Sequence, residues 1–256
     1  VSIPQMKVPV IGTFDYQFIC RFHLFYTHLV PHDYFFVFYN IIFSTIKKLW
    51  YTYSEARVIL IDIPIGLPSK EFKTRPCDKA ARQVLSPKRH HSIFSPPCRE
   101  ALTAERYREA CRINQNVCER KISKQAWHIS RKIKEVDDLM TAQTEADDII
   151  KETHPEICFW ALAHKEPMVH YKKSPQGEAE RFAVLKKHFG KSSAVIKSAL
   201  GRYPRKQLAH DDILDALVNA VTAARLNVSK ETLPPEPSRD IFGLPMQMVY
   251  SPSNLR

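Results

Sequence analysis

The fold is decided by one stretch, Arg57-Val-Ile-Leu-Ile-Asp-Ile-Pro-Ile-Gly-Leu67. The run of Val, Ile and Leu before Asp62 is unbroken, and Pro64 and Gly66 interrupt the chain soon afterwards. An apolar run of this kind is typical of a strand covered on both faces, as in the parallel part of an α/β sheet. The stretch therefore predicts a buried strand over residues 57–63, with Asp62 where a sheet ends.

Asp62 has two interpretations. A carboxylate at the tip of a central strand is costly unless it is hydrogen-bonded, paired or bound to a metal, and strand ends are where α/β folds place their sites. On this interpretation Asp62 is a functional residue. The structural alternative is that Asp62 caps a helix or bonds a turn before Pro64.

The composition is that of a globular protein with a strongly basic balance. The 256 residues can bury a sizeable core, and 44% hydrophobic with 25% charged residues is ordinary. However, 38 Lys and Arg stand against 27 Asp and Glu, which gives a net charge of +11 and a pI of about 9.4. This excess favours a polyanionic partner, and nucleic acid, DNA or RNA, is the first candidate.

The cysteines, the longest apolar run and the glycines disfavour secreted, membrane-spanning and glycine-loop nucleotide-binding classes of protein. The six cysteines form no C-x-x-C pair, and no secretory signal is recognisable, so we expect reduced thiols in a cytoplasmic protein. The longest apolar run, residues 34–43, covers about half of the ~20 residues of a membrane-spanning helix, so we expect no membrane insertion. With 6 glycines and no G-x-G-x-x-G or G-x-x-x-x-G-K, an actin-like sugar kinase or ATPase is disfavoured.

Hydrophobic periodicity and the positions of capping and turn residues predict the remaining helices and strands. Aromatic and β-branched residues before position 44 suggest two or three strands in a meander. Helices are expected over residues 100–118, 123–140, 177–189 and 208–226, and short strands over residues 157–160 and 247–250. The Pro-rich tail is expected to wrap the surface.

A second group of acids opens the helix predicted over residues 208–226. Spacings of three and four place Asp212 and Asp211 on the same side of this helix as Asp215. An acid in a first helical turn is explained by capping and by the helix dipole. Asp215, however, lies at the edge of the apolar face, and three acids in five residues repel one another unless a cation lies among them.

These acids suggest one kind of chemistry. Asp62, Asp212 and Asp215 can converge as oxygen ligands of Mg²⁺ or Mn²⁺, and Glu156 is a further candidate. Two such ions, held by carboxylates, support phosphodiester cleavage. We therefore predict a metal-dependent nuclease. The alternative is a catalytically weak or inactive nucleic-acid-binding protein.

Basic residues downstream of Asp62 are candidates for phosphate binding. Arg75, Arg82, Arg99 and Lys132 are predicted to line the approach to Asp62 and hold the nucleic-acid backbone. The alternative is that these side chains form solvated faces or pair with carboxylates such as Asp78 or Glu135.

Several motifs together resemble one known family. They are Ile61-Asp-Ile-Pro-Ile-Gly-Leu67, Arg75-Pro-Cys-Asp78, Ile93-Phe-Ser-Pro-Pro-Cys-Arg99, Ser123 to Trp127 with Lys132 to Asp137, His154-Pro-Glu156, Asp211-Asp-Ile-Leu-Asp-Ala-Leu217, and Asp240-Ile-Phe-Gly-Leu244 followed by Tyr250. Their order is similar to that in the family called domain of unknown function 429, whose members are regarded as predicted nucleases. The resemblance covers about residues 44–250.

The resemblance implies a fold. It implies an α/β, ribonuclease-H-like mixed sheet, with an antiparallel meander followed by parallel strands and flanked by helices. The expected organisation is a single domain over residues 1–256, with a helical insertion at about residues 70–150 and a Pro-rich tail at about residues 232–256. The acids of the helix with Asp212 and Asp215 should then face the end of the Asp62 strand.

The chain departs from the family at its N-terminal segment. The family opens with a strand ending in an Asp-Gly pair, which should supply the first metal ligand, and this chain contains no Asp-Gly. Asp15 is the nearest substitute and Asp33 the next. If Asp15 takes that place, the Tyr16 that follows it lacks the freedom of glycine. We therefore expect any cleavage to be slow and to prefer Mn²⁺.

Overall fold

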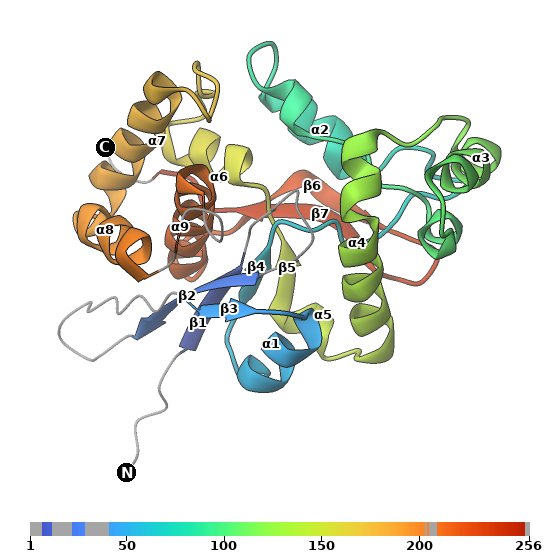
Figure 1. Cartoon of the computed structure of the whole chain (residues 1–256), viewed down its shortest axis with the longest axis horizontal. Helices are drawn as coiled ribbons and strands as arrows, with labels where there is room; N and C mark the ends of the chain where they lie inside the picture. The colour runs from blue at the N-terminus through green and yellow to red at the C-terminus, as the bar shows by residue number, and fades with distance from the viewer. Residues whose placement is uncertain (1–6, 12–21, 29–40, 203, 205–208, 254–256) are drawn as a thin grey trace.

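A five-stranded mixed sheet forms the centre of the molecule (Figure 1). The computed structural model describes residues 7–11, 22–28, 41–202, 204 and 209–253. The strands are β1 (Lys7–Ile11), β2 (Phe22–His28), β3 (Ile41–Phe43), β4 (Ile59–Ile61) and β5 (Ile150–Glu152), in the spatial order β3-β2-β1-β4-β5. The pairs β1–β2 and β2–β3 are antiparallel, whereas β4 runs parallel to both β1 and β5.

Both faces of β4 are covered, as its continuous apolar run predicts. Val58 and Leu60 point into one core with the helices α6 (Pro155–Leu162), α7 (Pro175–His188), α8 (Ser192–Arg202) and α9 (His210–Arg225). Ile59 and Ile61 point into a second core with α1 (Ile46–Tyr53) and α4 (Lys124–Ala142). Side chains alternate between the faces of a strand. Asp62, next in this alternation after Leu60, therefore lies on the α9 side.

The segment between β4 and β5 is largely helical. It holds α2 (Pro76–Val84), two short 3₁₀ helices, η1 (His90–Ser92) and η2 (Arg99–Thr103), then α3 (Tyr107–Cys118), α4 and α5 (Ala146–Ile149). The helix predicted over residues 100–118 is thus divided in two. The helix predicted over residues 123–140 is α4, and it begins at the expected Ser123, whose hydroxyl accepts a hydrogen bond from the Ala126 N–H.

One prediction about the C-terminal half is wrong. Residues 157–160 belong to helix α6, not to a strand, and every residue of α6 is buried. A run buried on all sides carries no helical periodicity, so its apolar residues look alike in either structure. The Pro-rich tail contains two strands, β6 (Glu231–Arg239) and β7 (Pro245–Tyr250), which form an antiparallel pair, and β7 includes the strand predicted over residues 247–250.

The β6–β7 pair packs against the centre of the molecule. Leu233, Met246 and Met248 share a core with residues of α2 and α6. Strand β7 also passes close to Gly66, which has a φ of +71°, and a Cβ there would lie 2.8 Å from Cγ of Met246. The glycine is therefore needed both for its backbone conformation and for its closeness to β7.

The N-terminal candidates Asp15 and Asp33 lie outside the described residues. Within the described ranges, no helix combines the length and the apolar character needed to cross a membrane.

Candidate functional site

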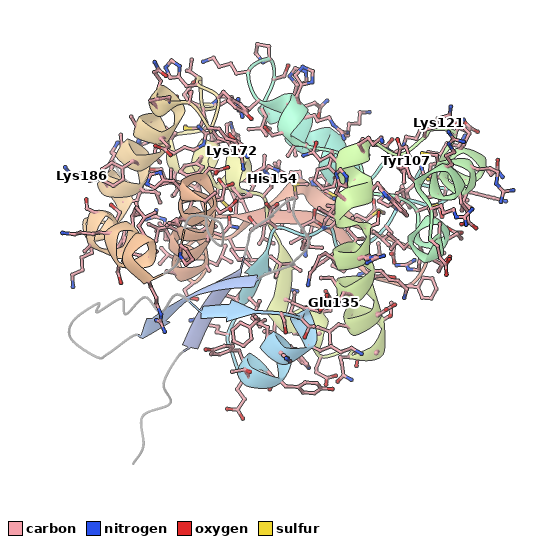
Figure 2. The ribbon with its side chains drawn as sticks, in the orientation of Figure 1. Tyr107, Lys121, Glu135, His154, Lys172 and Lys186 are labelled. Atoms are coloured by element: carbon pink, nitrogen blue, oxygen red, sulfur yellow. The ribbon has the colours of Figure 1, made fainter. Side chains whose placement is uncertain are left out.

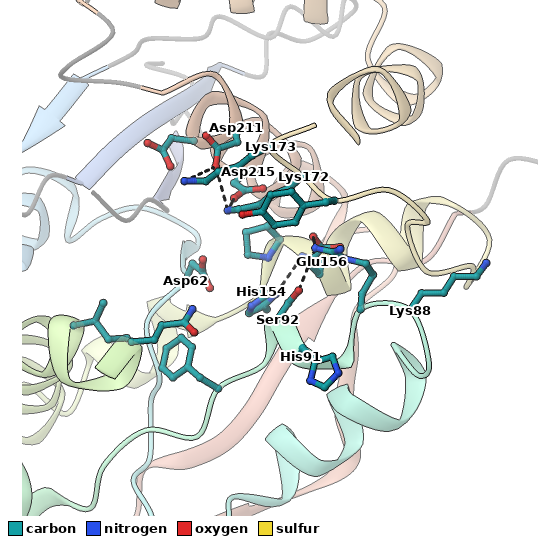
Figure 3. A pocket seen from close by; sticks show the side chains of 17 residues that line it. Asp62, Lys88, His91, Ser92, His154, Glu156, Lys172, Lys173, Asp211 and Asp215 are labelled. Carbon is teal, nitrogen blue, oxygen red and sulfur yellow. Dashed lines mark hydrogen bonds and ion pairs between the residues drawn. The ribbon is translucent and has the colours of Figure 1, made fainter. Parts of the chain in front are cut away.

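A cavity of about 390 Å³ lies beyond the carboxyl ends of β4 and β5 (Figure 3). We call it the central cavity. Its acidic side is lined by Asp62, Glu156, Asp211, Asp212 and Asp215, and its basic residues are Lys88, Arg89, Lys172 and Lys173, with His91, Ser92, Phe94, Gln125, Ile129, His154, Pro155 and Tyr171 completing the lining. The strand ends and the start of α9 thus meet at one site, as the sequence predicts.

Asp62 faces the central cavity directly after β4. The side chain is half-buried and points toward the space that Lys172 and Asp215 enter from the other side (Figure 3). Burial raises the pKa of Asp62 well above its ordinary value, and the negative charge of Asp215 raises it further. A carboxylate in this environment gains from any cation brought close to it.

The acids of α9 are held together by a lysine. Nζ of Lys172, in the loop before α7, lies 2.7 Å from Oδ2 of Asp215 and 3.5 Å from Oδ2 of Asp211. Burial alone would lower the pKa of Lys172, but the charge of Asp215 and its hydrogen bond raise it well above the ordinary value. Lys172 therefore carries the positive charge that this group of acids requires. Figure 2 shows Lys172 and His154 at the centre of the molecule, whereas Lys186 lies on its outer side.

Asp212 and Asp211 have different surroundings. Oδ2 of Asp212 accepts a hydrogen bond from the Ala209 N–H at 3.3 Å, so this acid caps the start of α9. Burial, followed by the charge of Asp211, raises the pKa of Asp212 to about 7. Asp211 also lies 3.9 Å from Nζ of Lys173. The first acids of α9 thus have structural contacts in addition to their place at the cavity.

His154 fixes the start of α6 at the edge of the central cavity. Its Nδ1 accepts a hydrogen bond from the Glu156 N–H at 3.2 Å, and the ring also bonds the Ser92 backbone. Burial lowers the pKa of His154 to about 4, so the ring is neutral at pH 7. The chain just before it is tied to β4, because the Thr153 N–H donates to the Ile61 carbonyl. The neutral His154 is therefore a cap beside Asp62.

Glu156, the further candidate ligand, is already paired. Oε1 of Glu156 lies 2.5 Å from Nη2 of Arg181 on α7 and 3.3 Å from Nη2 of Arg89. Both Glu156 and Arg181 are buried. Glu156 thus connects α6 to α7 and to the loop after α2, and it positions Arg89 in the wall of the central cavity.

The sequence model of the family described as "Protein of unknown function (DUF429)" matches residues 21–239. The chain belongs to the DUF429 family. No curated protein and no solved structure matches it. The family match begins after Asp15, so neither the match nor the described structure covers this candidate ligand.

The DUF429 motif residue Arg75 is buried inside the protein. Its guanidinium donates to Oε2 and Oε1 of Glu152 at 2.7 and 2.8 Å, and to Oδ1 of Asp78 at 2.5 Å. Arg75 also donates to the carbonyls of Ile65 and Gly66. With an exposed fraction of 1%, Arg75 has no surface for a phosphate. Its pairing with Asp78 matches the structural alternative.

The other predicted phosphate ligands of this DUF429 protein also have internal partners. Arg82 donates to the Ile93 carbonyl and to Oγ of Ser95. Lys132, which is buried, donates to the Ser44 carbonyl and to Oε2 of Glu135. Neither Arg82 nor Lys132 lines the central cavity.

Arg99 joins three parts of the chain. It bonds both oxygens of Asp137 on α4 at 2.7 Å and Oδ2 of Asp240 at 2.6 Å. The same Asp240 accepts from the Leu67 N–H and the Leu244 N–H, each at 3.0 Å. Arg99 and Asp240 thus connect the segment after Asp62, helix α4 and the β6–β7 pair.

The cations that do line the central cavity were not selected from the sequence. Lys88 and Arg89 follow α2, and Lys172 and Lys173 precede α7. Lys88 and Arg89 belong to the basic stretch downstream of Asp62, and Lys172 and Lys173 are adjacent basic residues. Runs of basic residues are common on solvated faces, so the sequence did not single out these four.

Among the described His, Cys, Asp and Glu residues, one trio has donor atoms that all lie within 4.8 Å of one another, namely Cys77, Asp78 and Glu152. The guanidinium of Arg75 already supplies a positive charge to this trio. Asp62, Asp212 and Asp215 line one cavity but are not drawn together to this degree.

Proposed function

We propose that the central cavity is the active site of a metal-dependent nuclease that hydrolyses phosphodiester bonds in nucleic acid. One observation carries the proposal. Asp62, at the end of β4, and Asp215, on α9, face one cavity closely enough for the charge of Asp215 to raise the pKa of Asp62. The two residues are 153 positions apart in the sequence (215 − 62), so the fold brings these acids together.

The sheet supports a ribonuclease-H-like arrangement within this proposal. Three antiparallel strands come first, and β1 pairs in parallel with the strand that precedes Asp62. In register, Val10 lies opposite Leu60 and Ile11 opposite Ile61. The carboxyl end of β1 therefore reaches the same edge of the sheet as Asp62.

The donor set suits a hard divalent cation. Asp62, Asp212 and Asp215 offer only carboxylate oxygens, which Mg²⁺ and Mn²⁺ prefer. Such an ion would supply an activated water and stabilise the leaving oxygen of the phosphodiester. The ammonium of Lys172 now lies among the same acids, so it must withdraw from Asp215 for these acids to serve as ligands.

The basic residues of the cavity complete the proposed site. Lys88 and Lys173 are exposed and can hold phosphate oxygens of a nucleic-acid backbone. Arg89 is positioned by Glu156 at the same wall. A phosphodiester bound there lies between these cations and the acids of β4 and α9.

Nucleic-acid binding without cleavage is the second candidate. Two observations favour it. The Lys172 ammonium already pairs with Asp211 and Asp215, and the described residues of β1, Lys7 to Ile11, include no acid. A cavity with a built-in lysine can bind phosphate and still lack the full set of ligands that two metal ions need.

Cleavage of labelled single- and double-stranded DNA and RNA in Mg²⁺ or Mn²⁺ tests the proposal. We expect cleavage by the wild-type protein and background activity from Asp62→Asn and Asp215→Asn. Asp138→Asn is the matched control, because Asp138 is an exposed acid on α4 paired with Lys134. Cleavage unaffected by the first two substitutions would overturn the assignment, and binding without cleavage by the wild-type protein would favour the second candidate.

A further inference from the structure

Tyr171 is a large aromatic residue that lines the central cavity and remains exposed. The exposed fraction of Tyr171 is 61%, although the next residue, Lys172, is fixed to Asp215 inside the cavity. The tyrosine therefore stands at the mouth, with its ring accessible to solvent. A ring in this place offers an apolar face beside the charges that would hold a phosphate.

The loop that carries Tyr171 is firmly held by α7. The Tyr171 carbonyl accepts hydrogen bonds from the N–H and the hydroxyl of Ser174 at 2.9 and 2.7 Å. It also lies against Gly177, where a Cβ would come within 1.9 Å of the carbonyl oxygen. A side chain at position 177 would thus displace the loop.

The residues just before Tyr171 are fixed as well. The N–H groups of Val169 and His170 donate to the two carboxylate oxygens of Glu180 at 2.7 and 2.9 Å. The His170 carbonyl accepts from the buried Arg181. The backbone on both sides of Tyr171 is therefore anchored, and little conformational entropy remains to be lost if a ligand stacks on the ring.

We propose, resting on the proposed function, that the central cavity takes one unpaired nucleotide of a single strand or a frayed end, with its base stacked on Tyr171. Its phosphate then reaches the cations Lys88 and Lys173. In a duplex the faces of the bases are covered by their neighbours, whereas an unpaired base presents a face to an aromatic side chain. The substrate class is thus single-stranded nucleic acid.

The size of the central cavity agrees with a single nucleotide. Its volume of about 390 Å³ lies near the lower end of the roughly 300–1,000 Å³ of pockets that enclose small ligands. The lining combines the exposed ring of Tyr171, on which a base can stack, with the exposed Lys88 and Lys173, which can hold a phosphate.

Binding measured in EDTA tests the proposal without any need for cleavage. Fluorescence anisotropy with labelled single-stranded DNA and RNA oligonucleotides, and with duplexes of the same sequence, compares wild type with Tyr171→Ala and Tyr171→Phe. We expect the wild type to bind single strands more tightly than duplexes. Tyr171→Ala should weaken single-strand binding by roughly 5- to 150-fold, the range of one lost base stack. Tyr171→Phe should bind within about twofold of wild type, because it keeps the ring.

Tyr51→Ala is the matched control, because Tyr51 is an equally exposed tyrosine on α1, with an exposed fraction of 73%. Equal effects of Tyr51→Ala and Tyr171→Ala, or equal affinity for single strands and duplexes, would overturn the proposal. Tyr171-dependent single-strand binding by a protein that cleaves nothing would support it and refute the nuclease activity. Cleavage of a duplex by a protein whose binding does not depend on Tyr171 would support the nuclease activity and refute the stacking proposal.

Discussion

Nζ of Lys172 lies 2.7 Å from Oδ2 of Asp215, and the two side chains come from different elements that meet at the central cavity. The contact offsets part of the repulsion among the acids of α9. Under the proposed function, a divalent cation would compete with Lys172 for the same carboxylates. Cleavage would then require Lys172 to leave Asp215.

Replacement of Lys172 by Met should reveal this competition. In EDTA the variant should lose about 1–3 kcal/mol of unfolding free energy, less than the ~3–5 kcal/mol of a fully buried pair, because the Lys172 side chain is 32% exposed. Urea unfolding measures the loss. Added Mn²⁺ should then stabilise Lys172→Met more than wild type, since the acids are free to bind it. Lys186→Met, an exposed lysine on α7, is the control, and equal Mn²⁺ responses in all three proteins would contradict the prediction.

Replacement of Arg75 by Met should destabilise the whole fold. Arg75 is buried between Glu152 and Asp78, so its loss leaves two buried carboxylates without their cation. We expect a loss of about 3–5 kcal/mol in urea unfolding, and only partial rescue by Arg75→Lys, which cannot make the paired hydrogen bonds. Lys73→Met breaks an exposed pair with Glu119 and should cost less than about 1 kcal/mol. An Arg75→Met protein as stable as Lys73→Met would show that the buried pair contributes nothing.

His154 should make the protein sensitive to acid. Burial lowers its pKa to about 4 in the folded state, against 6.5 for the unfolded chain. The native state therefore binds fewer protons, so this contribution to stability is present above pH 6.5 and is lost as the pH falls toward 4. The slope from one such group is at most about 1.4 kcal/mol per pH unit. The difference in unfolding free energy between wild type and His154→Asn should show this slope. Parallel curves of unfolding free energy against pH for the two proteins would refute the prediction.

Phosphate binding should depend on the residues that line the central cavity and not on those selected from the sequence. Lys88→Ala and Lys173→Ala should each weaken binding to labelled single strands of different sequence alike. Each should also reduce the slope of log affinity against log salt concentration by about 0.7. This is the contribution of one phosphate contact on a single strand. Arg82→Ala should leave the salt slope unchanged, because Arg82 is engaged with Ile93 and Ser95. A lower salt slope for Arg82→Ala, with unchanged slopes for Lys88→Ala and Lys173→Ala, would contradict this prediction. It would favour Arg82 as a phosphate ligand, as predicted from the sequence.

The approach of Asp62 to the α9 acids was predictable because local patterns determine it. The apolar run before Asp62 predicts a strand buried on both faces, and alternation then decides the side on which the carboxylate lies. The stripe of α9 likewise places Asp215 at the edge of its buried face. The two patterns together indicate one site, although neither gives a distance.

The partners of the basic residues could not be predicted, because they are distant in the sequence. Arg75 meets Glu152 across 77 positions, and Arg99 meets Asp240 across 141. Only the short-range partners Asp78 and Glu135, which pair with Arg75 and Lys132, were visible as alternatives. The strand predicted at residues 157–160 failed for another reason, since its residues are buried on every side; the His154-Pro155 cap was the available signal for a helix.

The contacts of Asp240 decide how short a recombinant version of the chain can be. A fragment limited to the family match would stop at residue 239, one position before the carboxylate that binds Arg99 and the Leu67 N–H. Such a fragment would keep Asp62 and Asp215 yet lose β7, which packs against Gly66 four residues after Asp62. Recombinant versions of this protein therefore need the chain to continue through Tyr250 if the segment that follows Asp62 is to be held in place.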